Sequence, residues 1–145
     1  MKPLAEVKFI AVHSAGSKSS MDVTTNTLWQ WHVTERGWSD IGYHFFIKFD
    51  GTVHKCRDVK YQGAHCEAIN DKSIAVCIEG GYGGVDNFTA IQKHALFALI
   101  TEQKDAHKNS AVVGHNHFDK KACPCFDVVS WFDELTGYLA SKRNE

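Results

Sequence analysis

The sequence predicts an α/β fold: a single domain over residues 1–145, with a central mixed β-sheet of about five strands flanked by about three helices. Three observations predict it. Short β-rich runs are separated by segments of helical character, which is typical of a sheet covered by helices. Two of the runs are joined by Asp50-Gly51, a hairpin signal that makes the sheet mixed rather than wholly parallel. The composition, 43% hydrophobic and 23% charged, is that of an ordinary globular domain.

Five runs of residues predict the strands. The first of them, VKFIAVH, is almost continuously apolar, as expected of a strand that is covered on both faces. The second and third flank the hairpin signal, the fourth ends at a pair of glycines, and the fifth leads into a segment rich in histidine and cysteine. The expected strands are residues 7–13, 43–49, 52–57, 73–79 and 110–115.

The first helix is expected between the first and second strands. Thr27 and Gln30 have the spacing of a capping box, in which two side chains bond reciprocally to the first backbone N–H groups of a helix. This spacing predicts a helix that starts near Thr27, and Gly37 supplies its stop.

Two further helices are expected in the second half of the chain. Thr89 and Gln92 repeat the capping-box spacing and start a helix that extends as far as His107. The last helix follows Asp127, where apolar residues recur every three or four positions and so share one helical face. These residues are Val128, Trp131, Phe132, Leu135, Tyr138 and Leu139.

Composition and segment content exclude several classes of protein. The formal net charge is -1, so no overall field of one sign favours nucleic acid or anionic lipid. The N-terminal apolar run is interrupted by Glu6 and Lys8 and does not read as a signal peptide. No stretch approaches the ~18 apolar residues of a membrane-spanning helix. An odd number of cysteines, five, argues against a disulfide framework, so we expect reduced thiols.

A candidate metal site lies at the ends of two expected strands. His13 closes the first strand and His115 closes the last, and ligand-binding groups in α/β sheets gather at strand ends. Cys123 follows eight residues after His115, a loop long enough to fold back. Two imidazoles and one thiolate would leave a fourth tetrahedral position for water, as in catalytic zinc sites.

Spacing alone leaves alternatives to this set. In extended chain His117 points to the same side as His115, and Cys125 to the same side as Cys123, so local geometry cannot choose between them. A cysteine nucleophile at Cys123 or Cys125 with a nearby histidine is a rival, because catalytic thiols need similar neighbours. The HExxH and GxSxG motifs of other hydrolases are absent.

Four segments in order resemble one enzyme family. The chain is similar to the zinc-dependent N-acetylmuramoyl-L-alanine amidases, a family that also includes peptidoglycan-recognition-like proteins. Within it, the likeness is to the short, single-domain "lysozyme" amidases of T-odd tailed phages. The segments are FIAVHSA (9–15), WHVTERGWSDIGYHFFIKFDGTV (31–53), GAHCEAINDKSIAVCIEGG (63–81) and GHNHFDKKACPCFD (114–127).

The resemblance implies a ligand set for Zn²⁺. His13, His115 and Cys123 match the three zinc ligands of the family. Two positions beside them depart from its pattern. Cys125 stands where a serine is commoner, so a second thiol could compete for the metal or oxidise with Cys123, and His117 replaces what is often an acid.

The resemblance also implies catalytic and substrate-binding residues. Tyr43 and Lys121 match catalytic positions, and His65 falls where the family lines its substrate groove. Tyrosine and lysine are normally poor bases near neutral pH. We therefore expect Lys121 to face the developing oxyanion, and Tyr43 to orient the water or the carbonyl. Without the resemblance, a core aromatic residue and a solvated surface charge would be the default interpretations.

The implied function is hydrolysis of the amide between N-acetylmuramic acid and L-alanine in peptidoglycan, as a phage endolysin in host cell lysis. The partner is peptidoglycan of the Gram-negative type, and we expect a monomer without a separate cell-wall-binding domain. We expect synthesis in the host cytoplasm and action on the wall after the membrane is breached. Direct contacts with nucleic acid or a membrane are not expected.

Two other classes of function stay open. One is a noncatalytic peptidoglycan-binding module, against which the retention of Tyr43, Lys121 and Cys123 together argues. The other is a regulator that binds phage RNA polymerase, as a second role, because the phage branch of the family includes such partners.

Overall fold

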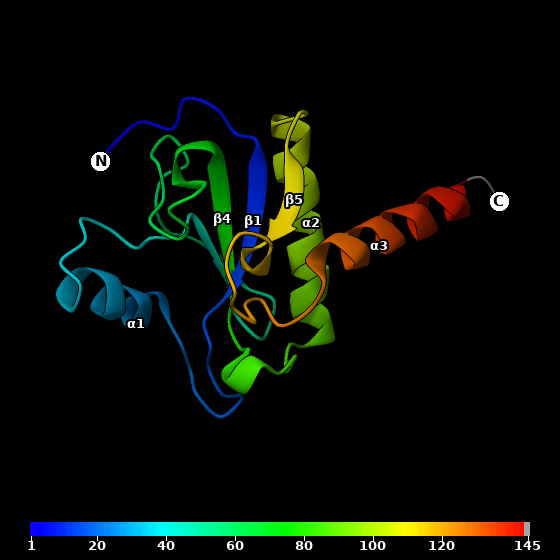
Figure 1. The fold of residues 1–145 in the computed structure, drawn as a ribbon. Coiled ribbons are helices and arrows are strands. Elements are labelled where there is room, and N and C mark those ends of the chain that lie inside the picture. Colours follow the sequence, from blue (N-terminus) through cyan, green and yellow to red (C-terminus); the bar gives the residue numbers. More distant parts are fainter. Residues whose placement is uncertain (144–145) are drawn as a thin grey trace.

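A five-stranded mixed sheet forms the centre of the protein, in a computed structural model that describes residues 1–143 (Figure 1). The strands are β1 (Phe9–Ser14), β2 (Phe45–Ile47), β3 (Val53–Lys55), β4 (Ser73–Ile78) and β5 (Ala111–Gly114). Their order in the sheet is β3-β2-β4-β1-β5. β1 lies between β4 and β5 and is parallel to both, β2 is parallel to β4, and β3 is antiparallel to β2. The predicted mixed α/β sheet is confirmed.

The predicted hairpin joins β2 to β3. Gly51 has a φ of +87°, a left-handed conformation that glycine adopts without steric cost. Asp50 accepts a hydrogen bond from the Thr52 N–H through its side chain, at 2.9 Å, which closes the turn. The two strands are shorter than the runs that predicted them, because paired residues extend only from Phe45↔Lys55 to Ile47↔Val53.

Side chains alternate between the two faces of the sheet. On one face, Ile10 and Val12 belong to the largest apolar cluster, which includes residues of α2 (Ala90–Ala106). The other face carries smaller clusters, one of them containing Leu28 of α1 (Thr25–Trp29). Helices therefore cover both faces, which explains why the parallel strands are almost continuously apolar. His13 follows the same alternation and lies on the face opposite the large cluster.

The first helix starts earlier than the sequence predicts. Thr24 is its N-cap and forms a capping box with Thr27, which is the third residue of the helix and not the cap. The predicted start near Thr27 is therefore wrong by two residues. The helix continues as a π-helical turn over Gln30–Thr34. Gly37 has a φ of +75° and donates its N–H to the Val33 carbonyl, which confirms the predicted stop.

The second helix, α2, begins where the sequence predicts. Thr89 caps it in a capping box with Gln92, and His107 is its C-cap. Gln92 is fully buried and its amide donates to the carbonyls of Ile47 and Glu79, at 3.1 and 2.7 Å. These two bonds attach the start of α2 to neighbouring strands of the sheet.

The last helix, α3 (Val128–Arg143), follows Asp127 as predicted, and Asp127 accepts the Ser130 N–H. Only the start of its apolar face is buried, because the helix extends away from the sheet (Figure 1). Val128 and Phe132 are buried, Trp131 and Leu135 are half-buried, and the last two apolar residues of the face, Tyr138 and Leu139, are exposed. Among residues 1–143, no helix combines the length and the apolar character that crossing a membrane requires.

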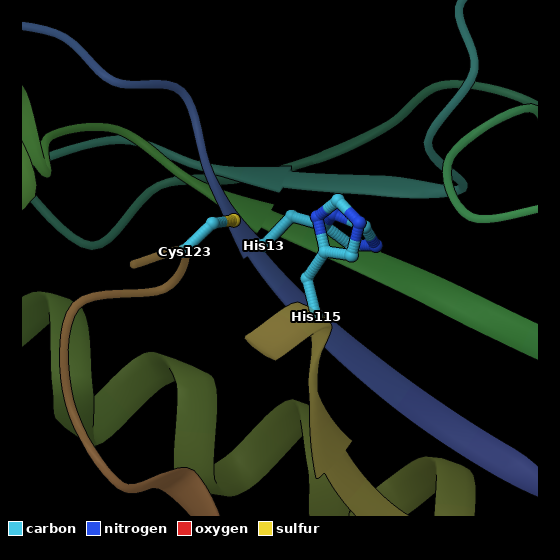
Figure 2. Close-up of side chains that lie close together, drawn as sticks. All are labelled: His13, His115 and Cys123. Carbon is cyan, nitrogen blue, oxygen red and sulfur yellow. The ribbon is translucent and has the colours of Figure 1, made fainter. Parts of the chain in front are cut away.

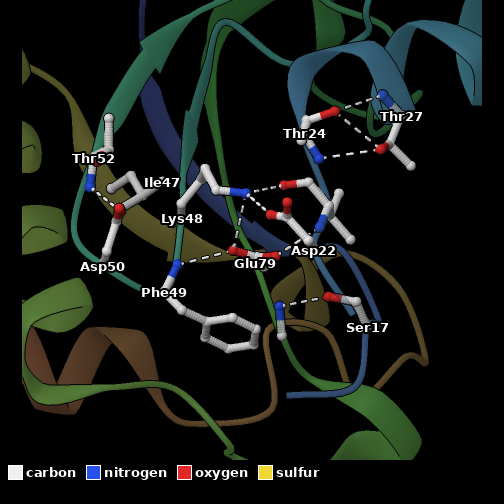
Figure 3. Close-up of polar contacts among 12 residues, drawn as sticks. Ser17, Asp22, Thr24, Thr27, Ile47, Lys48, Phe49, Asp50, Thr52 and Glu79 are labelled. Atoms are coloured by element: carbon white, nitrogen blue, oxygen red, sulfur yellow. Dashed lines mark hydrogen bonds and ion pairs between the residues drawn. The ribbon is translucent and has the colours of Figure 1, made fainter. Parts of the chain in front are cut away.

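A buried carboxylate connects the loops at the carboxyl ends of the parallel strands. Glu79, which is 1% exposed, follows β4 and accepts hydrogen bonds from the backbone N–H groups of Val23 and Phe49, at 2.8 and 3.0 Å (Figure 3). Lys48 Nζ lies 3.7 Å from the same carboxylate and 2.6 Å from that of Asp22. Glu79 thereby attaches the segment that leads into α1 to the sheet.

We predict that Glu79→Ala destabilises the fold through the loss of this contact. The substitution leaves the Val23 and Phe49 N–H groups without their acceptor, and each buried unpaired group costs about 1–3 kcal/mol. Urea denaturation measures the change in unfolding free energy. The control is Asp86→Ala, which removes a more exposed partner of Lys93 and should cost about 0–1 kcal/mol. Equal losses in the two variants would contradict the role assigned to Glu79.

Candidate metal centre and groove

Three side chains from distant parts of the chain converge at the carboxyl ends of β1 and β5. His13 belongs to β1, and His115 is the first residue after β5. Cys123 returns to them from the loop before α3 (Figure 2). Their ligand atoms all lie within 4.8 Å of one another. The structure therefore brings together the three residues that the sequence singled out for a metal.

The loop that carries Cys123 is fixed by contacts at both sides of the site. The Cys123 carbonyl accepts the Asn116 N–H at 2.8 Å, next to His115. The Cys123 Sγ accepts the Ser14 N–H at 3.0 Å, next to His13. The backbone that presents each histidine thus also holds the cysteine.

The two competing residues lie outside this group. His117 is exposed, and its ring packs against Phe118 with 4.9 Å between the centroids. Cys125 directs its Sγ to the Gly81 carbonyl, at 3.5 Å, and to the Ser14 hydroxyl, at 3.8 Å. Within residues 1–143, His13, His115 and Cys123 form the one cluster of three or more such side chains that could hold a metal ion.

Burial keeps both imidazoles of the cluster neutral. His13 is 2% exposed, and burial lowers its pKa well below 6.5, with smaller contributions from His65 and His115. Burial also lowers the pKa of His115, and the charge of Lys121 adds to that effect. Neutral imidazole is the form that binds metal ions, so the two histidines are ready to act as ligands.

Burial has the opposite effect on the thiol of Cys123. It raises the pKa of Cys123, although the hydrogen bonds from Ser14 lower it in part. Reactive catalytic cysteines have lowered pKa values, because the thiolate is the nucleophile. The environment of Cys123 therefore favours a metal ligand over a nucleophile. As a ligand, the thiol would lose its proton only when the ion binds.

Tyr43 lies beside the histidines. Its ring is tilted against that of His13, with 5.3 Å between the centroids. Burial raises the pKa of Tyr43 well above 10, and the neighbouring thiols of Cys77 and Cys123 raise it further. The side chain is therefore a neutral phenol at physiological pH, able to donate or accept a hydrogen bond but unsuited to act as a base.

Lys121 lies at the rim of the site and is linked to it by an acid that the sequence analysis did not identify. The side chain is 62% exposed, and its Nζ lies 3.8 Å from Asp119 Oδ2. The same Asp119 oxygen lies 3.5 Å from His115 Nε2. The i,i+4 spacing of His115 and Asp119 was the one signal of this contact in the sequence.

His65 contacts His13 directly. Its Nδ1 lies 2.8 Å from His13 Nε2, and its Nε2 lies 2.9 Å from Ser73 Oγ. The sequence predicted a groove position for His65 but did not indicate its contact with His13, which lies far away in the chain.

A groove with a volume of about 880 Å³ opens over the cluster. His13, His115 and Cys123 line it, as do Tyr43, His65 and Lys121. Further walls come from residues 32–38 and 64–70. Pockets of roughly 300–1,000 Å³ are typical of sites that bind small ligands. All six residues predicted from the sequence thus line one cavity.

Comparisons with known proteins agree with this geometry. Residues 3–126 match the protein family described as N-acetylmuramoyl-L-alanine amidase. The chain is 38% identical to the endolysin of Klebsiella phage KP32 over 133 residues, which are 89% of this chain and 87% of that protein. It is 39% identical to the endolysin of Enterobacteria phage T3 over 137 residues, 92% of this chain and 90% of that protein.

A solved structure extends the comparison to the fold. The N-acetylmuramoyl-L-alanine amidase LysC from Clostridium intestinale aligns with a TM-score of 0.77 and 25% identity, over 93% of this chain and 86% of that one. The family match at residues 3–126 includes every residue that lines the groove, and the shared fold extends over most of the chain. The chain belongs to the N-acetylmuramoyl-L-alanine amidase family.

Proposed function

We propose that the chain is a zinc-dependent phage endolysin that hydrolyses the amide between N-acetylmuramic acid and L-alanine in peptidoglycan. The observation that carries this proposal is the cluster of two imidazoles and one thiol that lines the groove, in a member of the amidase family. Peptidoglycan of the Gram-negative type is the proposed substrate, because the likeness is to short phage amidases.

The donor set suits zinc. Zinc prefers nitrogen and sulfur ligands with bonds of about 2.0–2.3 Å, and ligand atoms within 4.8 Å of one another need only small side-chain rotations to meet on one ion. Three protein ligands leave a fourth position open, as in other catalytic zinc sites. When bound, the ion would supply Lewis-acid activation of a water molecule and of the scissile carbonyl.

Tyr43 and Lys121 have separate tasks in the proposed reaction. Tyr43 remains a phenol and orients the water or the carbonyl through its hydroxyl, beside His13. Lys121 also lines the groove, and its exposed, flexible stem carries the ammonium group. We assign that group to the carbonyl oxygen, which becomes negatively charged as the amide is attacked.

The setting of the reaction follows from the endolysin role. We propose synthesis in the host cytoplasm and action on the wall after the membrane is breached. The monomeric state and a second role in binding phage RNA polymerase remain predictions of the sequence. A noncatalytic peptidoglycan-binding module is the alternative that the experiments below distinguish.

We predict that the protein binds one zinc ion and that Cys123→Ser lowers its zinc content strongly, because a serine hydroxyl is a poor substitute for thiolate. Elemental analysis measures the metal, and release of new N-terminal alanine from peptidoglycan measures the reaction. Cys125→Ser is the matched control and should keep both, because its thiol lies outside the cluster. Stoichiometric zinc without hydrolysis would favour the binding module. Activity that survives chelation but not thiol alkylation would favour a cysteine nucleophile.

We predict that Lys121→Ala keeps its zinc and loses about 10²–10³-fold in kcat, the cost of removing one group that stabilises the oxyanion. Lys120→Ala removes the neighbouring exposed lysine and should leave kcat close to that of the parent. Steady-state hydrolysis and elemental analysis of both variants test this. Loss of metal in Lys121→Ala, or an equal fall in kcat for both lysines, would contradict the assigned role.

A further inference from the structure

A chain of hydrogen bonds leads from the metal cluster into the core. His13 Nε2 lies 2.8 Å from His65 Nδ1. His65 Nε2 lies 2.9 Å from Ser73 Oγ, and Ser73 Oγ lies 2.6 Å from the Ile69 carbonyl oxygen. His13, Ser73 and Ile69 are buried, and His65 is half-buried at the groove.

The far end of this chain fixes the direction of every bond in it. A carbonyl oxygen can only accept, so the Ser73 hydroxyl donates its one hydrogen to Ile69. Ser73 Oγ must then accept from the other neighbour, which is His65 Nε2–H.

A neutral imidazole carries a hydrogen on only one of its two nitrogens. The donor at one nitrogen therefore makes the other nitrogen an acceptor, in His65 and then in His13. The ring nitrogens of His65 contact His13 and Ser73, neither of which is acidic, so no negative charge beside the ring favours its protonated form and the ring is neutral. With its hydrogen on Nε2, His65 offers a lone pair at Nδ1, which accepts from His13 Nε2–H. Neutral His13 is then left with a lone pair at Nδ1.

We propose that His65, oriented by Ser73 and the Ile69 carbonyl, is a positioning residue that holds His13 in its Nε2–H tautomer and makes Nδ1 the metal-binding atom. The metal part of this inference rests on the proposed zinc site. The tautomer of His13 is independent of the zinc site, because hydrogen bonds within the protein alone determine it.

Further contacts hold His65 in place. Asn70 Oδ1 accepts the backbone N–H groups of His65 and Cys66, at 3.0 and 2.9 Å. Ser73 is the first residue of β4 and pairs in register with Phe9 of β1, the strand that carries His13. The sheet therefore fixes the two ends of this series of hydrogen bonds, and Asn70 fixes His65 at its centre.

The position of His65 has a consequence for its role in the groove. Both of its ring nitrogens already have partners within the protein, so neither is free to bond a substrate while the chain is intact. His65 contributes the surface of its ring to the groove and its nitrogens to His13. Outer partners of this kind typically change metal affinity or activity by about 10–100-fold when they are removed.

The first experiment measures the tautomer in the metal-free protein. Long-range ¹H–¹⁵N correlation spectra at neutral pH distinguish a protonated from an unprotonated nitrogen in each imidazole ring. We expect His13 and His65 both to carry their hydrogen on Nε2. A hydrogen on His13 Nδ1 in the parent protein would overturn the proposal, whatever the protein does with zinc.

The second experiment measures zinc affinity by competition with a chelator. His65→Ala and Ser73→Ala should bind zinc about 10–100-fold more weakly than the parent. His65→Gln should recover most of the affinity, because its amide can accept from His13 and donate to Ser73. His94→Ala removes an exposed imidazole on α2 and is the matched control, expected to bind as the parent does.

The outcomes separate the two proposals. Parent affinity in His65→Ala would refute the positioning role while leaving the zinc site intact. A parent protein that binds no zinc would refute the metal site, and the spectra of the metal-free protein would still decide the tautomer. An equal loss of zinc affinity in His65→Ala and His65→Gln would also contradict the role of these hydrogen bonds, because the glutamine preserves both of them.

Discussion

The parallel pairing of β1 with β5 is the constraint on which the site depends. Val12 pairs with Gly114, so the next residues of the two strands, His13 and His115, emerge side by side. Their ring centroids are 4.5 Å apart, although the residues come from opposite ends of the chain. A slip of one residue in this register would turn His13 into the opposite face of the sheet and separate the pair.

Burial at this edge of the sheet also determines the charge of the site. It lowers the pKa of His13 and His115 and raises that of Cys123 and Tyr43, so all four side chains are neutral before a metal arrives. The fold therefore avoids the large cost of burying isolated charges. When a metal cation binds, the Cys123 thiol loses its proton, and the charge of the resulting thiolate offsets part of the charge of the cation. This suits a site of two imidazoles and one thiol.

Much of the fold was readable from local patterns. β-rich runs predicted all five strands, a capping box predicted where α2 begins, and the apolar periodicity after Asp127 predicted α3. The start of α1 was misplaced because Thr24 and Thr27 both have side chains that can cap, and only the folded backbone decides which one does. The apolar stripe of α3 predicted its helical form but not how little of it the sheet covers.

The site could be predicted only in part, because local patterns do not show which side chains meet in the folded protein. Strand ends and the family resemblance pointed to His13, His115 and Cys123, but the periodicity of the loop could not separate Cys123 from Cys125. That choice depends on Ser14, whose N–H holds the Cys123 sulfur. The link between His65 and His13 was equally hidden, because a hydrogen bond between distant segments leaves no spacing signal in one sequence.

X-ray absorption at the zinc edge of the zinc-loaded protein tests the central claim most directly. The account predicts one sulfur neighbour at about 2.3 Å and three lighter neighbours at about 2.0–2.1 Å, two of them with the scattering pattern of imidazole. Two sulfur neighbours, which would bring Cys125 into the site, or a shell without sulfur would contradict it.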